Sequence, residues 1–194
     1  PASLDDVLAS AKEGRSPVSS AVQQEVRAML RHGTYKPSGR GKPASEFLLN
    51  AALRGEFPLV NGPADANNAI SLASGLPGSI FDADLTGPVL FLRYGLPGEA
   101  YVFNPSGQSI DLEDLLVVCR AKAGGWEPCG NPIKDSMSTK VRAETRNVIG
   151  VLYAPRSLGT AFAMLWAERL AEQLGVSCRA RAVGFCGPED PFAS

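Results

Sequence analysis

Apolar residues recur at helical spacing in the first third of the chain and again near its carboxyl end. One helix is predicted to begin near Ser20 and another to run from about Ser45 to Arg54. A longer helix is predicted from about Thr160 to Gly175, where the apolar stripe is longest. A helix that ends before Gly14 is predicted from the shared face of Leu4, Val7, Leu8 and Ala11. These faces are typical of helices that cover a core, and nothing in the first three helices demands chemistry.

Between these helices the pattern changes to short runs rich in β-branched and aromatic residues. Strands are predicted at residues 89–94, 100–104, 115–121 and 148–153. A Pro-Gly pair within residues 95–99 predicts that the first two strands form a hairpin, whereas residues 124–138 are expected to form a long irregular loop. Residues 179–184 alternate as a strand does, ahead of a loose tail. Short strands beside clustered helices indicate an α+β fold rather than alternating βαβ units.

Residues 57–91 organise the rest of the chain. Asn61-Gly62-Pro63 predicts a turn, because Gly tolerates positive φ and Pro fixes its own φ. Asp65 is then expected to cap a short helix that ends at Gly75. The four apolar residues that make one face of this helix are Ala69, Ile70, Leu72 and Ala73.

Two asparagines interrupt this helical pattern. Asn67 and Asn68 are poor helix formers, so they indicate either a turn or carboxamides that point away from the apolar face. A carboxamide both donates and accepts hydrogen bonds, which suits a polar ligand in a cleft. In the Leu76–Ser79 turn that follows, Gly78 leaves the backbone uncrowded, so a ligand can lie close to it.

The composition limits the function classes. With 194 residues, 44% of them hydrophobic, the chain can bury a full core, and one domain is expected. It has no apolar run of about 18 residues and no signal-peptide pattern at its amino end, so we expect a soluble, cytoplasmic protein without a membrane partner. The net charge of −1 argues against a protein that coats nucleic acid non-specifically.

The charge is nevertheless unevenly distributed, because residues 27–42 carry basic side chains and no acidic one. One interpretation is an ordinary solvated helix end and loop. The alternative is a patch that contacts the phosphates of one RNA segment. The candidate RNA-binding residues are Arg31, Tyr35, Lys36, Arg40 and Lys42.

The cysteines and the single histidine argue against metal and nucleophilic chemistry. The cysteines are too widely spaced for a Cys-x-x-Cys zinc motif, and His32 is far from all of them in the sequence. They are Cys119, Cys129, Cys178 and Cys186. His32 is also the only histidine that a Ser-His-Asp triad could use, and it is expected to be a solvated charge at a helix end. We therefore expect reduced, mostly buried thiols, no metal and no cofactor.

Two runs of residues carry a resemblance to a known family. The first comprises Asn67-Asn68, Gly75-Leu76-Pro77-Gly78-Ser79, Phe81-Asp82 and Gly87-Pro88, and the second is Thr139 to Ile149. Together they are similar to the editing module of the β subunit of bacterial phenylalanyl-tRNA synthetase. The resemblance spans residues 35–154, which leaves a helical extension at 1–34 and a helix with a tail at 155–194. Free-standing relatives of the module, with helices added at both ends, look closer to this chain than the synthetase itself does.

The resemblance implies a closed or nearly closed β-barrel-like core and hydrolysis of the ester that joins a wrong amino acid to tRNA. Such a site can work by polarising the carbonyl and placing a water, so it requires no nucleophilic side chain. Asn68 and Ser79 would then be catalytic, and the tRNA acceptor end would lie near the basic residues between Arg31 and Lys42. The residues implied to bind the aminoacyl ester are Asn67, Gly75, Pro77, Gly78, Asp135, Thr139 and Thr145.

Two residues depart from the module's pattern. Ser79 stands where the module commonly has a histidine, and Val151 stands where it has a glutamate that accepts a hydrogen bond from a tyrosine hydroxyl. Because Val151 offers no partner to a phenol, either the preferred amino acid differs or Asn67, Asn68 or Asp135 takes this role. Two further functions stay open: an RNA-binding or synthetase-associated module that has lost the chemistry, and a small-molecule binding protein or hydrolase that reuses the cleft.

Overall fold

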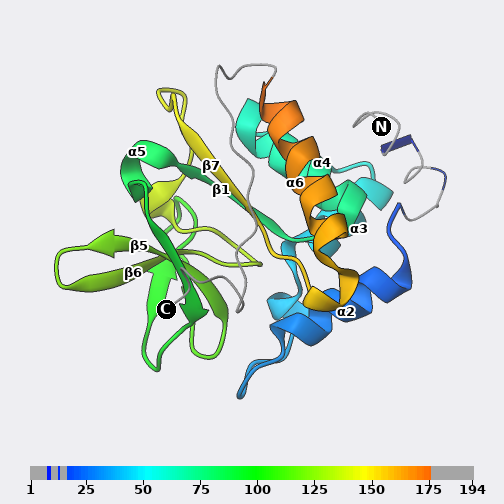
Figure 1. The fold of residues 1–194 in the computed structure, drawn as a ribbon. Helices are drawn as coiled ribbons and strands as arrows, with labels where there is room; N and C mark the ends of the chain where they lie inside the picture. Colours follow the sequence, from blue (N-terminus) through cyan, green and yellow to red (C-terminus); the bar gives the residue numbers. More distant parts are fainter. Residues whose placement is uncertain (1–7, 10–12, 14–16, 176–194) are drawn as a thin grey trace.

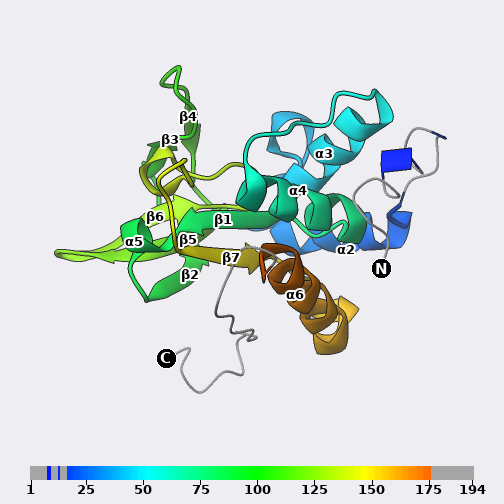
Figure 2. The same ribbon diagram turned by 90° about the horizontal axis from the view of Figure 1, so that it is seen from above.

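The computed structural model describes residues 8, 9, 13 and 17–175 (Figure 1). Two strands, β1 (Gly78–Asp82) and β7 (Val148–Leu152), form an antiparallel pair that runs between a layer of helices and a group of short sheets. Figure 2 shows the same division from above, with β1 beside α4 and β7 beside α6. The predicted strand at residues 179–184, the tail, Cys178 and Cys186 lie outside the described residues, as does most of the predicted first helix.

Except for α5 (Ala83–Thr86), which was not predicted, the described helices agree closely with the predictions from periodicity. The others are α2 (Ser20–Leu30), α3 (Ala44–Leu53), α4 (Gly62–Ser74) and α6 (Thr160–Gly175). The bounds predicted for the last helix are confirmed. In the described part of the chain, three 3₁₀ turns connect the elements: η1 (Gly39–Gly41), η2 (Met137–Thr139) and η3 (Arg156–Leu158).

The start of α4 differs from the prediction. Its N-cap is Asn61, whose side chain accepts a hydrogen bond from the backbone N–H of Ala64 at 3.0 Å. Pro63 fits within the first turn because that turn leaves its N–H groups unpaired in any case. Asp65 is therefore not the cap as predicted, and its carboxylate accepts from Val60 N instead, at 2.7 Å.

The helical layer is held by apolar clusters and one ion pair. Val26, Leu30 and Leu76 form a buried cluster against which Phe162 and Trp166 pack, so residues from both ends of the described chain share one core. The guanidinium of Arg27 donates two hydrogen bonds of 2.5 Å to the buried Glu46, which joins α2 to α3. Arg27 is therefore neutralised, although its own segment contains no acid. The division into residues 1–34, 35–154 and 155–194 stays a prediction.

The described strands form three separate antiparallel sheets, and the predicted closed or nearly closed barrel is wrong for this part of the chain. Besides the β1–β7 pair there is a three-stranded sheet in the order β2-β5-β6 and a two-stranded sheet of β3 and β4. Their bounds are β2 (Leu90–Tyr94), β3 (Ala100–Val102), β4 (Ser109–Asp111), β5 (Leu116–Lys122) and β6 (Gly125–Gly130). No ladder joins these sheets into a ring, so they pack against one another through side chains.

The pairing corrects two predictions about the loops. The predicted hairpin between the first two strands is wrong, because β2 pairs with β5 and β3 pairs with β4. Half of the segment predicted to be irregular is β6, which pairs with β5. The two glycines that turn the chain between them, Gly124 and Gly125, both have positive φ. Loop composition alone could not separate such a hairpin from an irregular loop.

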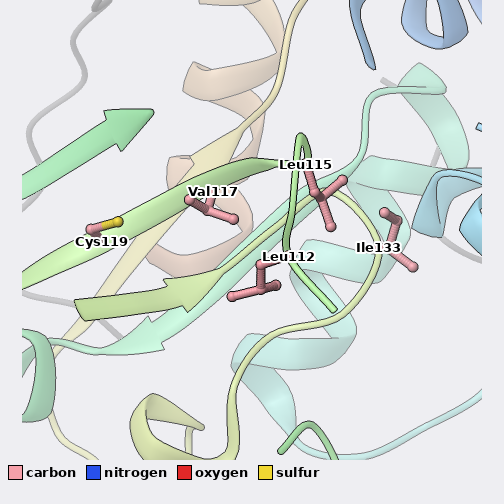
Figure 3. Close-up of a cluster of buried hydrophobic side chains, with 5 residues drawn as sticks. All are labelled: Leu112, Leu115, Val117, Cys119 and Ile133. Carbon is pink, nitrogen blue, oxygen red and sulfur yellow. The ribbon is translucent and has the colours of Figure 1, made fainter. Parts of the chain in front are cut away.

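Two buried clusters cover opposite faces of the three-stranded sheet, because successive residues of β5 point in opposite directions. Figure 3 shows one cluster, which contains Leu112, Leu115, Val117, Cys119 and Ile133. The other contains Phe81, Val118, Cys129 and Tyr153 and packs the sheet onto the β1–β7 pair. Burial raises the pKa of the Cys119 thiol to about 11 and that of Cys129 to about 12. The prediction of reduced, buried thiols is confirmed for these two cysteines.

Within the described part of the chain, no helix is long and apolar enough to cross a membrane. The same residues contain no group of three or more His, Cys, Asp or Glu side chains arranged to hold a metal ion.

Candidate functional site

Ser79 lies at the centre of a buried polar network. It is 0% exposed, and its hydroxyl donates to Asp135 Oδ1 at 2.6 Å. The Tyr153 hydroxyl lies 2.8 Å from the same Ser79 oxygen. Because Ser79 has one hydroxyl hydrogen and gives it to Asp135, Tyr153 must donate to Ser79 when Asp135 is ionised. The three side chains then form a directed chain of hydrogen bonds that ends on a carboxylate.

Asp135 is the ionisable group of this network that changes charge near neutral pH. Its second oxygen accepts from the backbone N–H of Ile80 at 3.3 Å. Burial raises the pKa of Asp135 from its usual value to about 7, and this effect outweighs the hydrogen bonds from Ser79 and Ile80 and the nearby charge of Lys140. Burial also lowers the pKa of Lys140, whose ammonium donates to the Phe103 carbonyl at 2.5 Å.

A glycine allows Asp135 to approach β1 so closely. A Cβ on Gly130, the last residue of β6, would lie 2.4 Å from Cζ of Phe81 and 2.8 Å from Asp135 Oδ1. The chain turns back after this glycine, and Ser136 N donates to the Cys129 carbonyl at 2.9 Å. The position of the carboxylate therefore depends on the missing side chain at residue 130.

Asn131 and Tyr101 shape the loop that carries Asp135. Asn131 Oδ1 accepts from the backbone N–H groups of Ile133 and Lys134, each at 2.8 Å, and its amide donates to the Tyr101 hydroxyl at 2.5 Å. Tyr101 in turn donates to the Lys134 carbonyl at 2.7 Å. Sequence reasoning missed Asn131, Tyr101 and Tyr153 as parts of the site. Only Tyr153 had a usable signal, because strand alternation puts it on the same face as Val151.

Asn67 holds the start of β1 in place. Its amide donates to the Gly78 carbonyl at 3.1 Å, and its Oδ1 has no hydrogen-bond partner although the residue is only 4% exposed. A Cβ on Gly78 would lie 2.5 Å from that Oδ1, so any other residue here would displace the Asn67 side chain. Asn68 is half-buried, and its side chain has no hydrogen-bond partner among the described residues. Both asparagines lie inside α4, so the turn interpretation of this pair is wrong.

The remaining predicted ester-binding residues fall into two places. Gly75 ends α4 with φ 78°, and the buried Pro77 accepts from Tyr153 N at 2.9 Å, so both lie in the segment that leads into Ser79. Thr139 is fully buried and donates to the Cys129 carbonyl at 3.3 Å. Thr145 donates to Asp82, at the other end of β1 from Gly78. Asn67 thus contacts β1 at Gly78 and Asp135 contacts it at Ser79, on opposite faces of the strand because successive residues alternate, and Thr145 lies apart from both.

Val151 lies directly opposite Ser79 in the β1–β7 pair. Residues opposite each other in antiparallel strands point to the same face, so Val151 borders the polar network without joining it. The carboxylate that does reach Ser79 belongs to Asp135, which is 56 residues away along the chain.

The candidate RNA-binding residues form an exposed basic segment at residues 31–42. Arg31, Lys36 and Arg40 are exposed and Lys42 is half-buried, and their side chains have no ion-pair partner among the described residues. Tyr35 differs from them, because its ring packs on apolar clusters and its hydroxyl donates to the Gly41 carbonyl at 2.5 Å. Its burial raises the pKa of the phenol to about 12. Tyr35 thus closes the loop and presents little surface to a ligand.

Replacing Tyr153 with phenylalanine is expected to lower the free energy of unfolding by about 1 kcal/mol, because Ser79 loses a buried hydrogen-bond donor. Equilibrium unfolding in urea measures the change. Tyr94→Phe is the matched control, since the Tyr94 hydroxyl has no hydrogen-bond partner among the described residues. Equal stability of the two variants would show that the Tyr153–Ser79 bond contributes nothing.

No family model matches this chain. Over 149 residues it is 24% identical to a phenylalanine–tRNA ligase beta subunit from Cutibacterium acnes. The matched region covers 75% of this chain and 17% of the ligase subunit, so the chain spans about a sixth of the length of this relative. The similarity indicates a distant relationship.

Proposed function

We propose that this chain is an editing module that hydrolyses the ester of a mischarged tRNA. The observation that supports this proposal most is the 2.6 Å hydrogen bond between Ser79 and Asp135, which holds a carboxyl group with a pKa of about 7 beside the start of β1. A carboxylate that ionises near neutral pH is suited to general-base catalysis. The distant similarity to a tRNA ligase beta subunit supports tRNA as the class of substrate.

In this proposal Asp135 is the general base, and the fully buried Ser79 orients it. The ionised carboxylate accepts a proton from water while the water oxygen bonds to the ester carbonyl carbon. When the tetrahedral intermediate collapses, the ribose oxygen leaves and takes that proton back from Asp135. The family resemblance assigns to Asn68 the amide N–H that is donated to the carbonyl oxygen, and its half-buried side chain has no hydrogen-bond partner among the described residues that would compete for this donor. The attacking group is water, so no acyl-enzyme forms.

The residue opposite Ser79 bears on which amino acid is removed. The resemblance places a glutamate at the position of Val151 in the synthetase module, and valine cannot accept a hydrogen bond from a phenol. A site without such a partner does not favour tyrosine over phenylalanine by hydrogen bonding. We therefore expect the preferred ester to carry an amino acid other than tyrosine.

A second candidate function is a tRNA-binding module without chemistry. The observation that favours it is the complete burial of Ser79, whose hydroxyl has two partners within the protein. The basic segment at residues 31–42 would serve either function by contacting phosphates, so RNA affinity alone does not distinguish the two.

The deciding experiment follows release of free amino acid from a panel of mischarged tRNAs. We expect release above the spontaneous rate from at least one of them, and we expect Asn68→Ala to lower that rate by about 100- to 1,000-fold, the range for a lost donor to the carbonyl oxygen. The stability of this variant should be unchanged or slightly raised, because alanine is the better helix former within α4.

Asn50→Ala is the matched control, since Asn50 is an exposed residue of α3 with no hydrogen-bond partner among the described residues. This variant should hydrolyse the ester as fast as the unmodified protein. If no tRNA in the panel loses its amino acid faster than in buffer, the hydrolase proposal fails and the binding module is left.

A further inference from the structure

Two exposed aromatic rings stack on each other where the helical layer meets the three-stranded sheet. The rings of His32 and Tyr94 have centroids 3.5 Å apart and planes 7° from parallel. His32 comes just after α2, and Tyr94 is the last residue of β2, so the pair joins segments that are distant in sequence. Tyr94 is 38% exposed and His32 is exposed, which leaves ring surface open to solvent.

The backbone holds this pair in a fixed position. The His32 carbonyl accepts from Tyr35 N at 2.8 Å, which closes the turn that carries the histidine. The same turn is tied to the sheets by Asp114, whose carboxylate accepts from Thr34 N at 2.7 Å and from the Thr34 hydroxyl at 2.9 Å. A side chain held in this way loses little conformational entropy when a ligand packs on it.

The basic segment surrounds the same turn. Arg31 precedes His32, Lys36 follows Tyr35, and the Tyr35–Gly41 hydrogen bond draws Arg40 and Lys42 back toward the turn. None of these four cations has an ion-pair partner among the described residues. Glu99 is paired with Arg93, whereas Asp114 accepts only from the uncharged groups of Thr34 and keeps its negative charge beside the turn. The four cations outnumber the two carboxylates next to the ring pair, Asp114 and Glu113, so this surface has an excess of positive charge.

We infer that the His32–Tyr94 pair is a stacking platform for a base of single-stranded RNA, whose phosphates contact Arg31, Lys36 and Arg40. Proteins that bind single strands combine aromatic rings with a positively charged path for the backbone. Every base has a π face that a flat ring can cover, so the platform selects for an unpaired nucleotide rather than for a sequence. The inference deepens the proposed function and rests on its choice of RNA as ligand, since a tRNA end offers unpaired nucleotides.

The test compares two fluorescently labelled probes of equal length and charge, a short oligoadenylate and the same backbone without bases. Fluorescence anisotropy should show that the protein binds the oligoadenylate about tenfold or more tightly than the abasic probe, as expected for one stacked base. Tyr94→Ala and His32→Gln should remove this preference and leave affinity for the abasic probe unchanged. Tyr94→Phe should keep it, because the ring remains. Lys36→Glu with Arg40→Glu should weaken binding of both probes and reduce the salt dependence.

Three results would overturn the inference. The first is equal affinity of the unmodified protein for both probes. The second is a preference for the oligoadenylate that is retained in Tyr94→Ala and His32→Gln. The third is an equal loss of affinity for both probes in these two variants. The last result would show that the pair only tethers the basic segment to the sheet. These measurements use uncharged RNA, so they can fail while the deacylation assay succeeds, and the reverse also holds.

Discussion

Replacement of Asp135 by asparagine is expected to slow release of the amino acid about 100-fold or more at pH 8, the usual loss when a general base is removed. Asparagine has nearly the same shape and can still hydrogen-bond Ser79 and Ile80 N, but it cannot take a proton from water. In the unmodified protein the rate should rise with pH through about 7 and then level off, because the ionised form of Asp135 is the active one. Single-turnover deacylation at a series of pH values measures both effects.

The same carboxyl makes stability depend on pH. Its folded-state pKa of about 7 is above the ordinary value of 3.8, so its favourable contribution is fully present below about pH 4 and is lost as pH rises to about 7. The full loss is on the order of 4 kcal/mol, at about 1.4 kcal/mol for each pKa unit. Urea unfolding at pH 5 and at pH 7.5 should therefore show a smaller decline for Asp135→Asn than for the unmodified protein.

Glu144→Gln is the matched control for this substitution. It removes the same charge from an exposed side chain without a hydrogen-bond partner among the described residues. Its stability should change with pH as that of the unmodified protein does, and its deacylation rate should be normal. If Asp135→Asn behaves like this control in both measurements, Asp135 is neither the base nor a buried ionisable group of any consequence.

An alanine at Gly130 is expected to lower the free energy of unfolding by about 2–3 kcal/mol, the upper part of the range for overpacking a core. The new Cβ would lie 2.4 and 2.5 Å from two atoms of the Phe81 ring, which is fully buried. The Cβ would also lie 2.8 Å from Asp135 Oδ1, so the carboxylate must shift and the deacylation rate should fall as well.

Gly62→Ala provides the comparison for Gly130→Ala. A Cβ at residue 62 meets no atom within 4 Å, and the position is the first residue of α4, where alanine is favourable. Chemical denaturation should find this variant within about 0.5 kcal/mol of the unmodified protein. If the two variants are equally stable, the contact between Gly130 and Phe81 can relax at no cost, and the proposed link between packing and the site is wrong.

Local patterns predicted the helices well because the apolar residues of a helix's buried face recur at helical spacing within the helix itself. Thr160–Gly175 needed only its apolar stripe, and Ser20–Leu30 needed a serine before an apolar run. The prediction that Asp65 caps α4 was wrong because Asn61-Gly62-Pro63 is equally suited to a turn and to the first turn of a helix. The structure decided in favour of the helix through the hydrogen bond from Ala64 N to the Asn61 side chain.

The candidate site was only partly predictable. Asn67, Ser79 and Asp135 were named from a family resemblance and from their polar character, and the structure places Asn67 and Asp135 in contact with neighbouring residues at the start of β1. Tyr153 was missed although alternation places it on the same strand face as Val151, since a tyrosine at the end of a strand is usually a core residue. No local pattern could have indicated that Thr145 binds Asp82 rather than sharing the surroundings of Ser79.

The sequence by itself determined the class of fold, the positions of the helices and most of the strands, and the run of basic residues at 27–42, because each of these depends on periodicity or charge within a short stretch. Only the tertiary structure decided which strands pair. The alternation of apolar and polar residues indicates that a strand has a buried face, but it does not indicate which strand lies beside it. The same holds for the chemistry of Asp135. Its pKa near 7 comes from removal of the carboxyl from water where its loop meets Ser79 and Ile80, more than 50 residues away along the chain, and the residues around position 135 do not by themselves indicate that burial.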